Sequence, residues 1–301
     1  MSRTDQYEKE NQYQGRVVVI TGASSGFGKG TALELARRGA SVVLAARNEE
    51  LLATIASQCE ALGGQALAVQ TDVSNRESLM NLATQAISRF EHFDVWINNA
   101  GVASIGRFDE VPLDDHIQVI QTDLVGTLMG SYVALKHFRE RWTGTLINVA
   151  SVIGKIPAPY YASYAAAKFG IVGLGDALRQ ELSQENDEAI RVCTVMPMAH
   201  NTDFFEHAGN YTGHKAEPIP PIYDPQVTVD ALVKLVVEPE DEVITGWQGG
   251  VFTFLHKLMP GAVEKMMASR TRKSQFEAPL APMTAGSVHD SERHLATSHR
   301  Q

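Results

Sequence analysis

Short apolar runs alternate with longer helical patterns from Arg16 to about residue 250, and this alternation restricts the fold more than any other feature of the sequence. The runs are rich in Val, Ile and Leu, as expected of strands that are buried on both faces. Strands separated by helices form a parallel sheet with helices on both sides. The sequence therefore predicts an α/β fold, a doubly wound parallel sheet of about seven strands. The predicted strands are residues 16–20, 41–46, 66–70, 93–98, 144–150, 190–196 and 241–246.

Residues 14–250 are predicted to form one domain, because no linker rich in Gly, Ser or Pro divides the alternation. At 44% hydrophobic residues, the chain has enough apolar material for a large core. Residues 1–13 are interpreted as a polar N-terminal arm and residues 251–275 as an amphipathic C-terminal extension. The polar composition of residues 276–301 predicts a disordered tail.

Local signals mark the ends of two predicted helices. Asn48 is placed to cap a helix that follows it, and Gly63 is placed to end that helix. Ser74 and Glu77 have the spacing of a capping box for the next helix. These signals agree with the strand–helix alternation.

Charge and cysteine content exclude several classes of protein. The formal charge is −9, and no Lys/Arg cluster of the kind that binds phosphate backbones occurs in the first 250 residues, so no nucleic-acid partner is expected. Cys59 and Cys193 lie far apart and suggest reduced thiols rather than a disulfide framework. The N-terminus is polar, and no apolar run approaches the roughly 18 residues of a membrane span. We expect a soluble, cytoplasmic protein.

Three glycines, Gly22, Gly26 and Gly28, lie between the first predicted strand and the helical segment after it. Glycine lets the backbone approach a ligand closely, and the helix directs free N–H groups at the same point. Such a turn suits a pyrophosphate and indicates a Rossmann-like dinucleotide fold. The spacing is G-x-x-x-G-x-G rather than the commoner G-x-G-x-x-G, and a tight connection without a ligand is the alternative.

The second predicted strand ends in Ala46 and Arg47, at a place where dinucleotide folds commonly carry an acidic residue against the ribose hydroxyls. A guanidinium there favours a 2′-phosphate and predicts a preference for NADP(H) over NAD(H). The alternative is an exposed surface arginine.

Tyr164 and Lys168 are four residues apart in an alanine-rich segment, which places them on one helix face. A tyrosine is a poor acid or base at neutral pH unless a positive charge stabilises its phenolate, and Lys168 can supply that charge. Ser151, at the end of the fifth predicted strand, can hydrogen-bond a substrate oxygen. By itself the Tyr–Lys pair also fits an ordinary pair on a helix surface.

Together these motifs resemble the classical short-chain dehydrogenase/reductase family over about residues 14–250. Ser151 stands thirteen residues before Tyr164, as in the family's Ser, Tyr and Lys catalytic positions. The other matching segments are "TGASSGFG" at 21–28, Asp72 with Val73, "NNAG" at 98–101, and Pro197 with Thr202. The glycine turn, Arg47 and the resemblance assign these residues to the cofactor: Gly22, Ser24, Ser25, Gly26, Phe27, Gly28, Arg47, Asp72, Val73, Asn99, Ala100, Gly101, Tyr164, Lys168, Pro197 and Thr202.

The resemblance implies an NADP(H)-dependent oxidoreductase that acts on a carbonyl compound or secondary alcohol. In it, Tyr164 would be the general acid or base, Lys168 would lower the tyrosine pKa and bind the nicotinamide ribose, and Ser151 would hold the substrate oxygen. The family often forms homodimers or homotetramers through the helices after its fourth and fifth strands. The alternatives are a related dehydratase or epimerase, and a cofactor-sensing protein without turnover.

Two residues depart from the family pattern. Asp123 stands where the family usually has an asparagine that supports a proton relay, so it is included among the predicted catalytic residues. Its negative charge would oppose formation of the Tyr164 phenolate and predicts a pH optimum moved upward. Met198 follows Pro197 where the family often has glycine, and it is expected either to narrow the nicotinamide site or to fill packing space.

The loop after the sixth predicted strand is expected to cover the substrate. Aromatic residues there suggest a partly apolar lid, although they could equally pack the loop onto the domain. His200, His207 and His214 lack partners in a ligand motif, so no metal is expected. The aromatic residues of the loop are Phe204, Phe205, Tyr211 and Tyr223, and Tyr160 and Tyr161 are further candidates to line the pocket.

The extension at 251–275 combines apolar residues with Lys257, Lys265, Arg270, Arg272 and Lys273. A basic amphipathic helix can lie on a membrane surface. Packing on its own domain or on a partner subunit is the alternative, and the commoner role of such a face.

Overall fold

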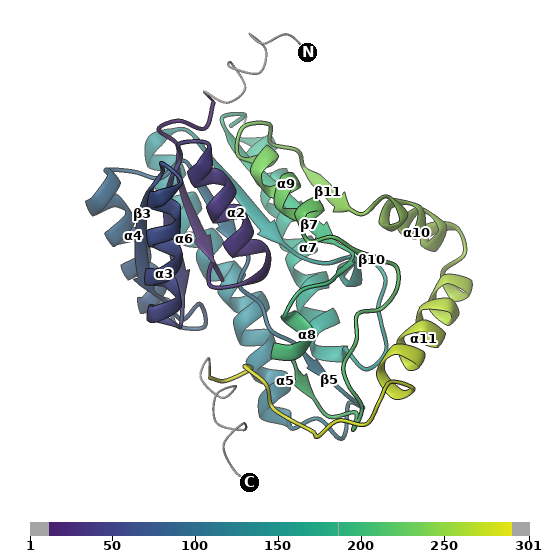
Figure 1. Cartoon of the computed structure of the whole chain (residues 1–301). Coiled ribbons are helices and arrows are strands. Elements are labelled where there is room, and N and C mark those ends of the chain that lie inside the picture. Colours follow the sequence, from purple (N-terminus) through teal and green to yellow (C-terminus); the bar gives the residue numbers. More distant parts are fainter. Residues whose placement is uncertain (1–11, 186, 291–301) are drawn as a thin grey trace, which may run out of the picture.

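A seven-stranded parallel sheet forms the centre of the molecule in a computed structural model, which describes residues 12–290 except residue 186 (Figure 1). The strand order is β11-β7-β6-β4-β1-β2-β3, and all seven predicted runs are strands of this sheet. The predicted fold class is therefore confirmed. The strands are β1 (Val17–Thr21), β2 (Ser41–Ala46), β3 (Gln65–Gln70), β4 (Val95–Asn98), β6 (Gly144–Val149), β7 (Ile190–Pro197) and β11 (Glu242–Thr245).

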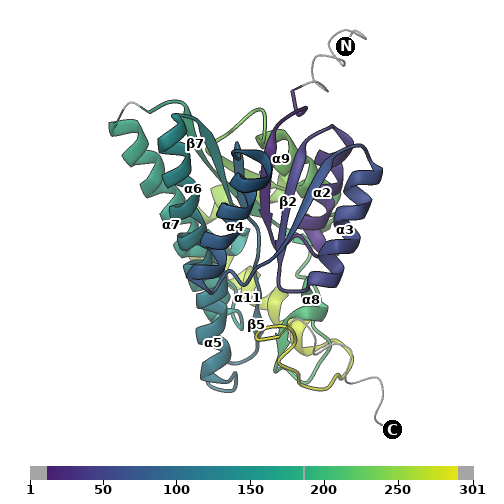
Figure 2. The same cartoon turned by 90° about the vertical axis from the view of Figure 1, so that its left-hand side faces the viewer.

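Helices cover both faces of the sheet, as the continuous apolar strands require (Figure 2). Alternate residues of β1 divide between the two faces: Val18 and Ile20 join one apolar core, and Val17 and Val19 join the other. One face is covered by α2 (Gly26–Arg37), α3 (Glu49–Ala61) and α9 (Gln226–Leu235), and the other by α4 (Arg76–Phe90), α6 (Gly126–Arg141) and α7 (Ala162–Gln184).

One predicted helix cap is correct and one is displaced. Asn48 accepts a hydrogen bond from the Leu51 amide and caps α3, and the chain leaves this helix through Gly63 at φ +99°. The N-cap of α4 is Asn75, one residue after the predicted Ser74. The Ser74 hydroxyl instead donates to the Asp72 carboxylate, which leaves the capping position to Asn75.

The remaining short elements lie beyond the carboxyl ends of the strands. Two pairs of short strands connect loops that are far apart in the sequence, β5 (Ser104–Ile105) with β9 (Gly209–Asn210) and β8 (Ala199–His200) with β10 (Ile222–Tyr223). The other elements are α5 (Leu113–Ile120), the π-helical η1 (Gln121–Val125), the 3-10 turn η2 (Val152–Gly154) and α8 (Phe204–His207).

The C-terminal part differs from the predicted boundaries. The boundary at residue 250 falls inside α10 (Trp247–Leu258), and α11 (Pro260–Phe276) follows it. The composition of residues 277–290, which we call the C-terminal strap, predicts disorder, but the strap forms two isolated β-bridges and buries Val288 completely. The bridges join it to the loop at residues 199–226, which we call the substrate loop after its predicted role. Residues 291–301 of the predicted tail and residues 1–11 of the predicted arm lie outside the described residues. Tyr13 is buried and belongs to the domain core.

A buried hydrogen-bond network joins β4 to β6 and α6. Asn98 Nδ2 donates to Asn148 Oδ1 on β6 at 2.9 Å and to the Ser131 hydroxyl on α6 at 3.2 Å, and Trp96 Nε1 donates to Asn98 Oδ1 at 2.8 Å. Gly130 of α6 faces this network, and a Cβ there would lie 2.2 Å from Asn98 Oδ1. The close approach of α6 to β4 therefore depends on a residue without a side chain.

Replacing Gly130 with alanine is expected to lower the free energy of unfolding by about 2–4 kcal/mol, because the methyl group must displace the buried network. Urea titration followed by circular dichroism measures this change. Gly173→Ala is the matched control: its Cβ meets nothing within 4 Å on α7, so it should stabilise by about 0.5–1 kcal/mol. Equal effects of the two substitutions would contradict the packing argument.

Candidate active site

The glycine turn forms a cradle at the carboxyl end of β1. Gly22 and Gly26 have φ of +67° and +51°, where a side chain would be strained. A Cβ on Gly28 would lie 2.3 Å from the Gly22 carbonyl oxygen, so the turn closes only with glycine there. Ser25 is the N-cap of α2, but its side chain makes no capping hydrogen bond. The first amides of α2 are thus left for a ligand, which fits an anion such as pyrophosphate.

The "NNAG" segment after β4 holds the cradle in place. The Asn99 side chain donates to the carbonyl oxygens of Thr21 at 3.0 Å and Gly22 at 3.2 Å. The Asn99 amide also donates to the Thr21 hydroxyl at 3.0 Å. The fourth strand therefore fixes the turn that follows the first.

A cavity of about 690 Å³ extends from this cradle across the carboxyl ends of the central strands. Most of the predicted site residues line it, although they come from separate parts of the sequence. Gly28 and Asp123 do not line it: Gly28 lies against the Gly22 backbone, and Asp123 is fully buried. The predicted residues on its wall are Gly22, Ser24, Ser25, Gly26, Phe27, Arg47, Asp72, Val73, Asn99, Ala100, Gly101, Ser151, Tyr164, Lys168, Pro197 and Thr202.

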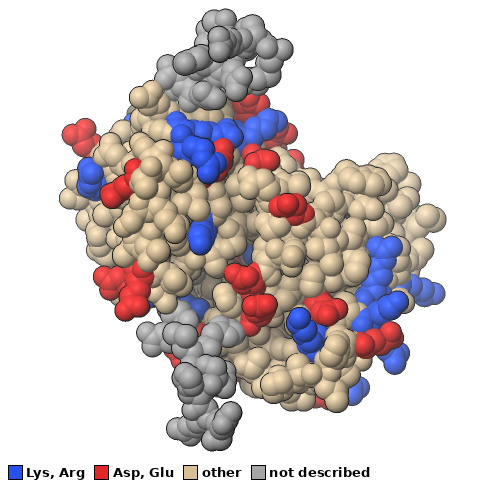
Figure 3. Space-filling view, in the orientation of Figure 1, with Lys and Arg blue, Asp and Glu red and all other residues tan. Residues whose placement is uncertain are grey.

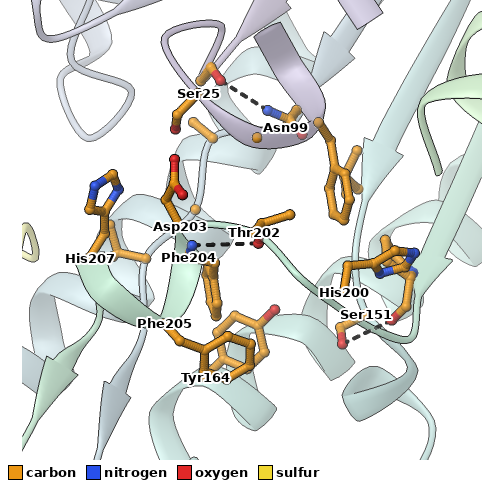
Figure 4. A pocket seen from close by; sticks show the side chains of 18 of the residues that line it. Ser25, Asn99, Ser151, Tyr164, His200, Thr202, Asp203, Phe204, Phe205 and His207 are labelled. Atoms are coloured by element: carbon orange, nitrogen blue, oxygen red, sulfur yellow. Dashed lines mark hydrogen bonds between the residues drawn. The ribbon is translucent and has the colours of Figure 1, made fainter. Parts of the chain in front are cut away.

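Ser151, Tyr164 and Lys168 meet at one end of this cavity. The side chains of Ser151 and Tyr164 are seen in Figure 4. Ser151 follows β6 at the start of η2, where its hydroxyl accepts from the Ile153 amide and donates to the Pro197 carbonyl at 3.4 Å. Tyr164 and Lys168 lie on α7, and the Lys168 ammonium is 5.3 Å from the centre of the Tyr164 ring. The helix spacing and the strand end thus bring these three groups together as predicted.

Asp123 lies directly behind Lys168. Its Oδ2 is 3.1 Å from Lys168 Nζ, and its Oδ1 accepts a hydrogen bond from the Val102 amide at 2.8 Å. Lys168 Nζ also donates to the Val149 carbonyl at 3.2 Å. Asp123 belongs to the π-helical turn η1, where the helix widens between α5 and α6.

Burial and these charges shift the pKa values of the group. Burial raises the pKa of Tyr164, Lys168 opposes that shift, and Asp123 adds to it. Burial lowers the pKa of Lys168, but the neighbouring Asp123 and Tyr164 reverse the effect and raise it overall. The pKa of Asp123 is raised by burial, against the attraction of Lys168. Lys168 therefore stays an ammonium, as its predicted action on Tyr164 requires.

Arg47 lies at the opposite end of the cavity, beneath the C-terminal strap. Its guanidinium donates to the carbonyl oxygens of Ser287 at 2.7 Å and His289 at 2.8 Å. The strap is fixed there by a hydrogen bond between His289 Nε2 and Asp115 Oδ1 at 2.9 Å. The sequence does not predict this contact: the two interpretations of Arg47 are a 2′-phosphate contact and an exposed surface residue, and the composition of residues 276–301 predicts disorder.

The substrate loop contributes some of its predicted aromatics to the cavity. Phe204 and Phe205 line it, and Phe204 contacts the Tyr164 ring at 5.7 Å between centroids. Tyr211 instead bonds Asp115, and the Tyr223 hydroxyl donates to Gln248 at 2.5 Å. These last two tyrosines therefore fasten the loop to the domain.

The two tyrosines before Tyr164 have different surroundings. Tyr161 lines the cavity and is 1% exposed, and its hydroxyl has no hydrogen-bond partner among the described residues. Tyr160 packs on Phe276 of α11. Tyr161 thus offers an unused polar group next to Tyr164.

Five C-terminal residues complete the cavity wall, although the sequence does not predict them there. The apolar pattern of residues 251–275 does not indicate which surface of the domain they cover. Met198, a predicted departure, packs against Gly246 and Gly249 as well as lining the cavity. The missed wall residues are Phe252, Met266, Met267, Arg270 and Ser287.

The three histidines of the substrate loop do not form a cluster. The ring of His200 is hydrogen-bonded to the Met198 carbonyl and the Thr228 hydroxyl, and that of His214 to the Ala278 carbonyl. Within residues 12–290, residue 186 aside, no group of three or more His, Cys, Asp or Glu side chains could hold a metal ion. In the same range, no helix is long and apolar enough to cross a membrane.

Comparison with known proteins places this chain in a family. The chain is 32% identical to the oxidoreductase YxnA of Bacillus subtilis over 303 residues, which cover 96% of this chain and 85% of that protein. It is 38% identical to the oxidoreductase Lmo0432 of Listeria monocytogenes over 193 residues, 64% of this chain and 77% of that protein.

Solved structures agree in fold. A short-chain type dehydrogenase/reductase from Mycobacterium marinum superposes with a TM-score of 0.69 at 25% identity, covering 80% of this chain and 97% of that one. A 3-ketoacyl-(acyl-carrier-protein) reductase from Brucella melitensis, complexed with NADH, has a TM-score of 0.67 at 26% identity and covers 77% and 96%. The short chain dehydrogenase profile matches residues 16–211, and the chain belongs to the short-chain dehydrogenase/reductase family of oxidoreductases.

Proposed function

We propose that this oxidoreductase transfers a hydride between NADP(H) and a carbonyl compound or secondary alcohol, with Tyr164 as its general acid and base. The observation that carries the proposal is the meeting of Ser151, Tyr164 and the Lys168 ammonium at the end of the cavity that begins at the glycine cradle. Reduction is the proposed direction in cells.

The residues around the cavity fit the cofactor. The α2 amides and the turn at Gly22 and Gly26 would hold the pyrophosphate, and Asp72 and Val73 would contact the adenine. Pro197 and Thr202 would hold the nicotinamide end, and Lys168 the adjoining ribose. When bound, the nicotinamide supplies or accepts the hydride.

The protein's own part in the reaction is to position an oxygen atom and move a proton. Ser151 holds the substrate oxygen, and Tyr164 donates a proton to it in reduction and removes one in oxidation. Lys168 stabilises the phenolate that is left after donation. Asp123 keeps Lys168 charged, and the Lys168 charge lowers the pKa of Tyr164. The Asp123 carboxylate itself raises the pKa of Tyr164, so its two effects on the tyrosine oppose each other.

The cavity wall favours a substrate of moderate size with an apolar body. Phe204, Phe205, Phe252 and Met266 all line it. Tyr161 supports a further contact, because its buried hydroxyl is available to donate to a polar group of the substrate. Two structural neighbours are named as reductases, of levodione and of 3-ketoacyl-(acyl-carrier-protein), which agrees with carbonyl reduction here.

The proposed preference for NADP(H) rests on Arg47. The Brucella melitensis neighbour holds NADH, so the fold alone does not select the phosphate. Glu50 lines the same part of the cavity, and its carboxylate would oppose a 2′-phosphate. Two N–H groups of the Arg47 guanidinium donate to the strap. A guanidinium has five N–H donors, so the remaining ones can bind the 2′-phosphate while the strap is in place.

We also propose that the protein forms a homodimer or homotetramer through α6 and α7. Leu128 and Tyr132 of α6 and Phe169 of α7 are exposed apolar side chains on these helices. Large exposed apolar groups on adjacent helices are typical of subunit contacts.

Tyr164→Phe is expected to lower kcat at least about a hundredfold, because the proton donor is lost while the cofactor site remains. Steady-state assays with NADPH and a panel of ketones and aldehydes provide the measurement. Tyr161→Phe, which removes a neighbouring hydroxyl, should mainly raise KM. A Tyr164→Phe enzyme with the wild-type rate would refute the role of Tyr164, and a wild-type protein that binds NADPH but turns over nothing would favour the cofactor sensor.

Arg47→Ala is expected to reduce the preference for NADPH over NADH by roughly ten- to a hundredfold, the value of a charge-assisted hydrogen bond. Titrations followed by nicotinamide fluorescence give both dissociation constants. Their ratio is informative because loosening of the strap affects both cofactors alike. Arg37→Ala, on the exposed side of α2, should leave the ratio of the two dissociation constants unchanged. If Arg47→Ala also kept the wild-type ratio, Arg47 would not bind the 2′-phosphate.

Asp123→Asn is expected to shift the pH profile of alcohol oxidation to lower pH. Oxidation needs the Tyr164 phenolate, so kcat/KM rises as pH passes through its pKa, and removing the Asp123 charge removes one cause that raises that pKa. The profile of Asp176→Asn should not move, because Asp176 lies on α7 with Tyr164 but its side chain faces solvent. An upward shift in Asp123→Asn would show instead that Asp123 acts chiefly by keeping Lys168 charged.

A further inference from the structure

The α10–α11 hairpin, residues 247–276, presents apolar side chains on its outer surface. The exposed fractions of Trp247, Phe254 and Leu258 are 75%, 62% and 63%. With Val251, also exposed, they are spaced by four, three and four residues and so share one face of α10. Met259 continues this face at the turn between the helices.

The opposite face of the hairpin fixes its orientation. Val263 and Met267 are buried in the apolar core near Tyr164. The Gln275 side chain donates to the Glu217 carbonyl at 2.6 Å, and Arg270 donates to the Pro220 carbonyl at 3.3 Å. The outer apolar face is therefore held away from the protein core.

The hairpin is basic although the chain as a whole is acidic. Residues 247–276 contain five Lys and Arg residues and a single acidic residue, Glu264, whereas the whole chain has a formal charge of −9. Glu264 itself is engaged by His256 at 3.0 Å. Figure 3 shows blue side chains gathered along the edge formed by α11, beside the uncharged surface of α10. The basic residues are Lys257, Lys265, Arg270, Arg272 and Lys273, of which Arg270 belongs to the inner face.

We infer that the α10–α11 hairpin docks on an anionic lipid surface. Exposed Trp, Phe and Leu side chains on one helix face beside a row of Lys and Arg match the boundary between lipid tails and charged headgroups. The hairpin lies in the plane of that boundary and does not cross it. A second copy of the chain fits less well, because a symmetric contact places the same basic side chains opposite one another.

The inner face of this hairpin forms part of the cavity. Phe252, Met266, Met267 and Arg270 line the cavity from α10 and α11. Docking therefore places the apolar end of the proposed substrate site beside a lipid phase. Lipid binding itself needs no turnover, so its test is separate from that of the proposed function.

Sedimentation of the full-length protein with vesicles tests the inference. We expect binding to vesicles of mixed phosphatidylcholine and phosphatidylserine, weaker binding as NaCl is raised, and much weaker binding to phosphatidylcholine alone. The double variant Arg272→Glu with Lys273→Glu should reduce partitioning by roughly thirtyfold or more, and Phe254→Glu with Leu258→Glu should do so at least about tenfold.

Control variants on other helices distinguish loss of the docking surface from a change in the net charge of the protein. Met80→Glu and Arg76→Glu, both on the exposed side of α4, add the same kinds of charge and should bind as the wild type does. Thermal unfolding confirms that each variant is folded. A blue shift of tryptophan fluorescence on adding vesicles should disappear in Trp247→Phe and persist in Trp142→Phe, whose side chain is also exposed.

Three results would overturn the inference. Absence of binding to the anionic vesicles is the first, and equal binding by the hairpin and control variants is the second. The third is a self-association, measured by sedimentation velocity, that is abolished by Phe254→Glu with Leu258→Glu while no variant affects lipid binding. The apolar face of α10 would then be a contact between subunits.

Discussion

The parallel register of the central strands is the constraint on which the rest of the structure depends. β1, β4, β6 and β7 run side by side in the same direction, so their carboxyl ends meet at one edge of the sheet. The glycine turn follows β1, the Asn99 segment follows β4, and Ser151 follows β6. The buried contact of Asn98 with Asn148 helps fix this register, because any slip would separate two buried amides.

A buried ion pair between Asp123 and Lys168 sets the charges next to Tyr164. Asp123 and Lys168 are nearly inaccessible to water, so each charge depends on the other, and removing one partner of such a pair costs roughly 3–5 kcal/mol. The π-helical turn at Asp123 and the amide of Val102 hold the carboxylate in position. A carboxylate in place of the asparagine usual in the family secures the Lys168 charge and raises the pKa of Tyr164.

The C-terminal residues line the cavity in two places. The α10–α11 hairpin forms a wall beside the proposed substrate site, and the strap reaches the cradle end through Arg47. Gly286 lies so close to the substrate loop that a Cβ would be 2.3 Å from the His207 carbonyl oxygen. The strap thus connects the substrate loop to Arg47, and these two regions cannot move independently while it is in place.

The sequence by itself determined the seven strands and the separate motifs of the site. Strands buried on both faces require continuous apolar runs, and the residues of the glycine turn, Ser151 and the Tyr164–Lys168 pair are local patterns. Only the tertiary structure decided on which part of the domain residues 251–290 pack. An amphipathic pattern shows that a helix has an apolar face but does not say what covers it. The strap is held by single contacts such as the burial of Val288 and the bonds from Arg47, which join residues about 240 positions apart and leave no periodic signal in the chain.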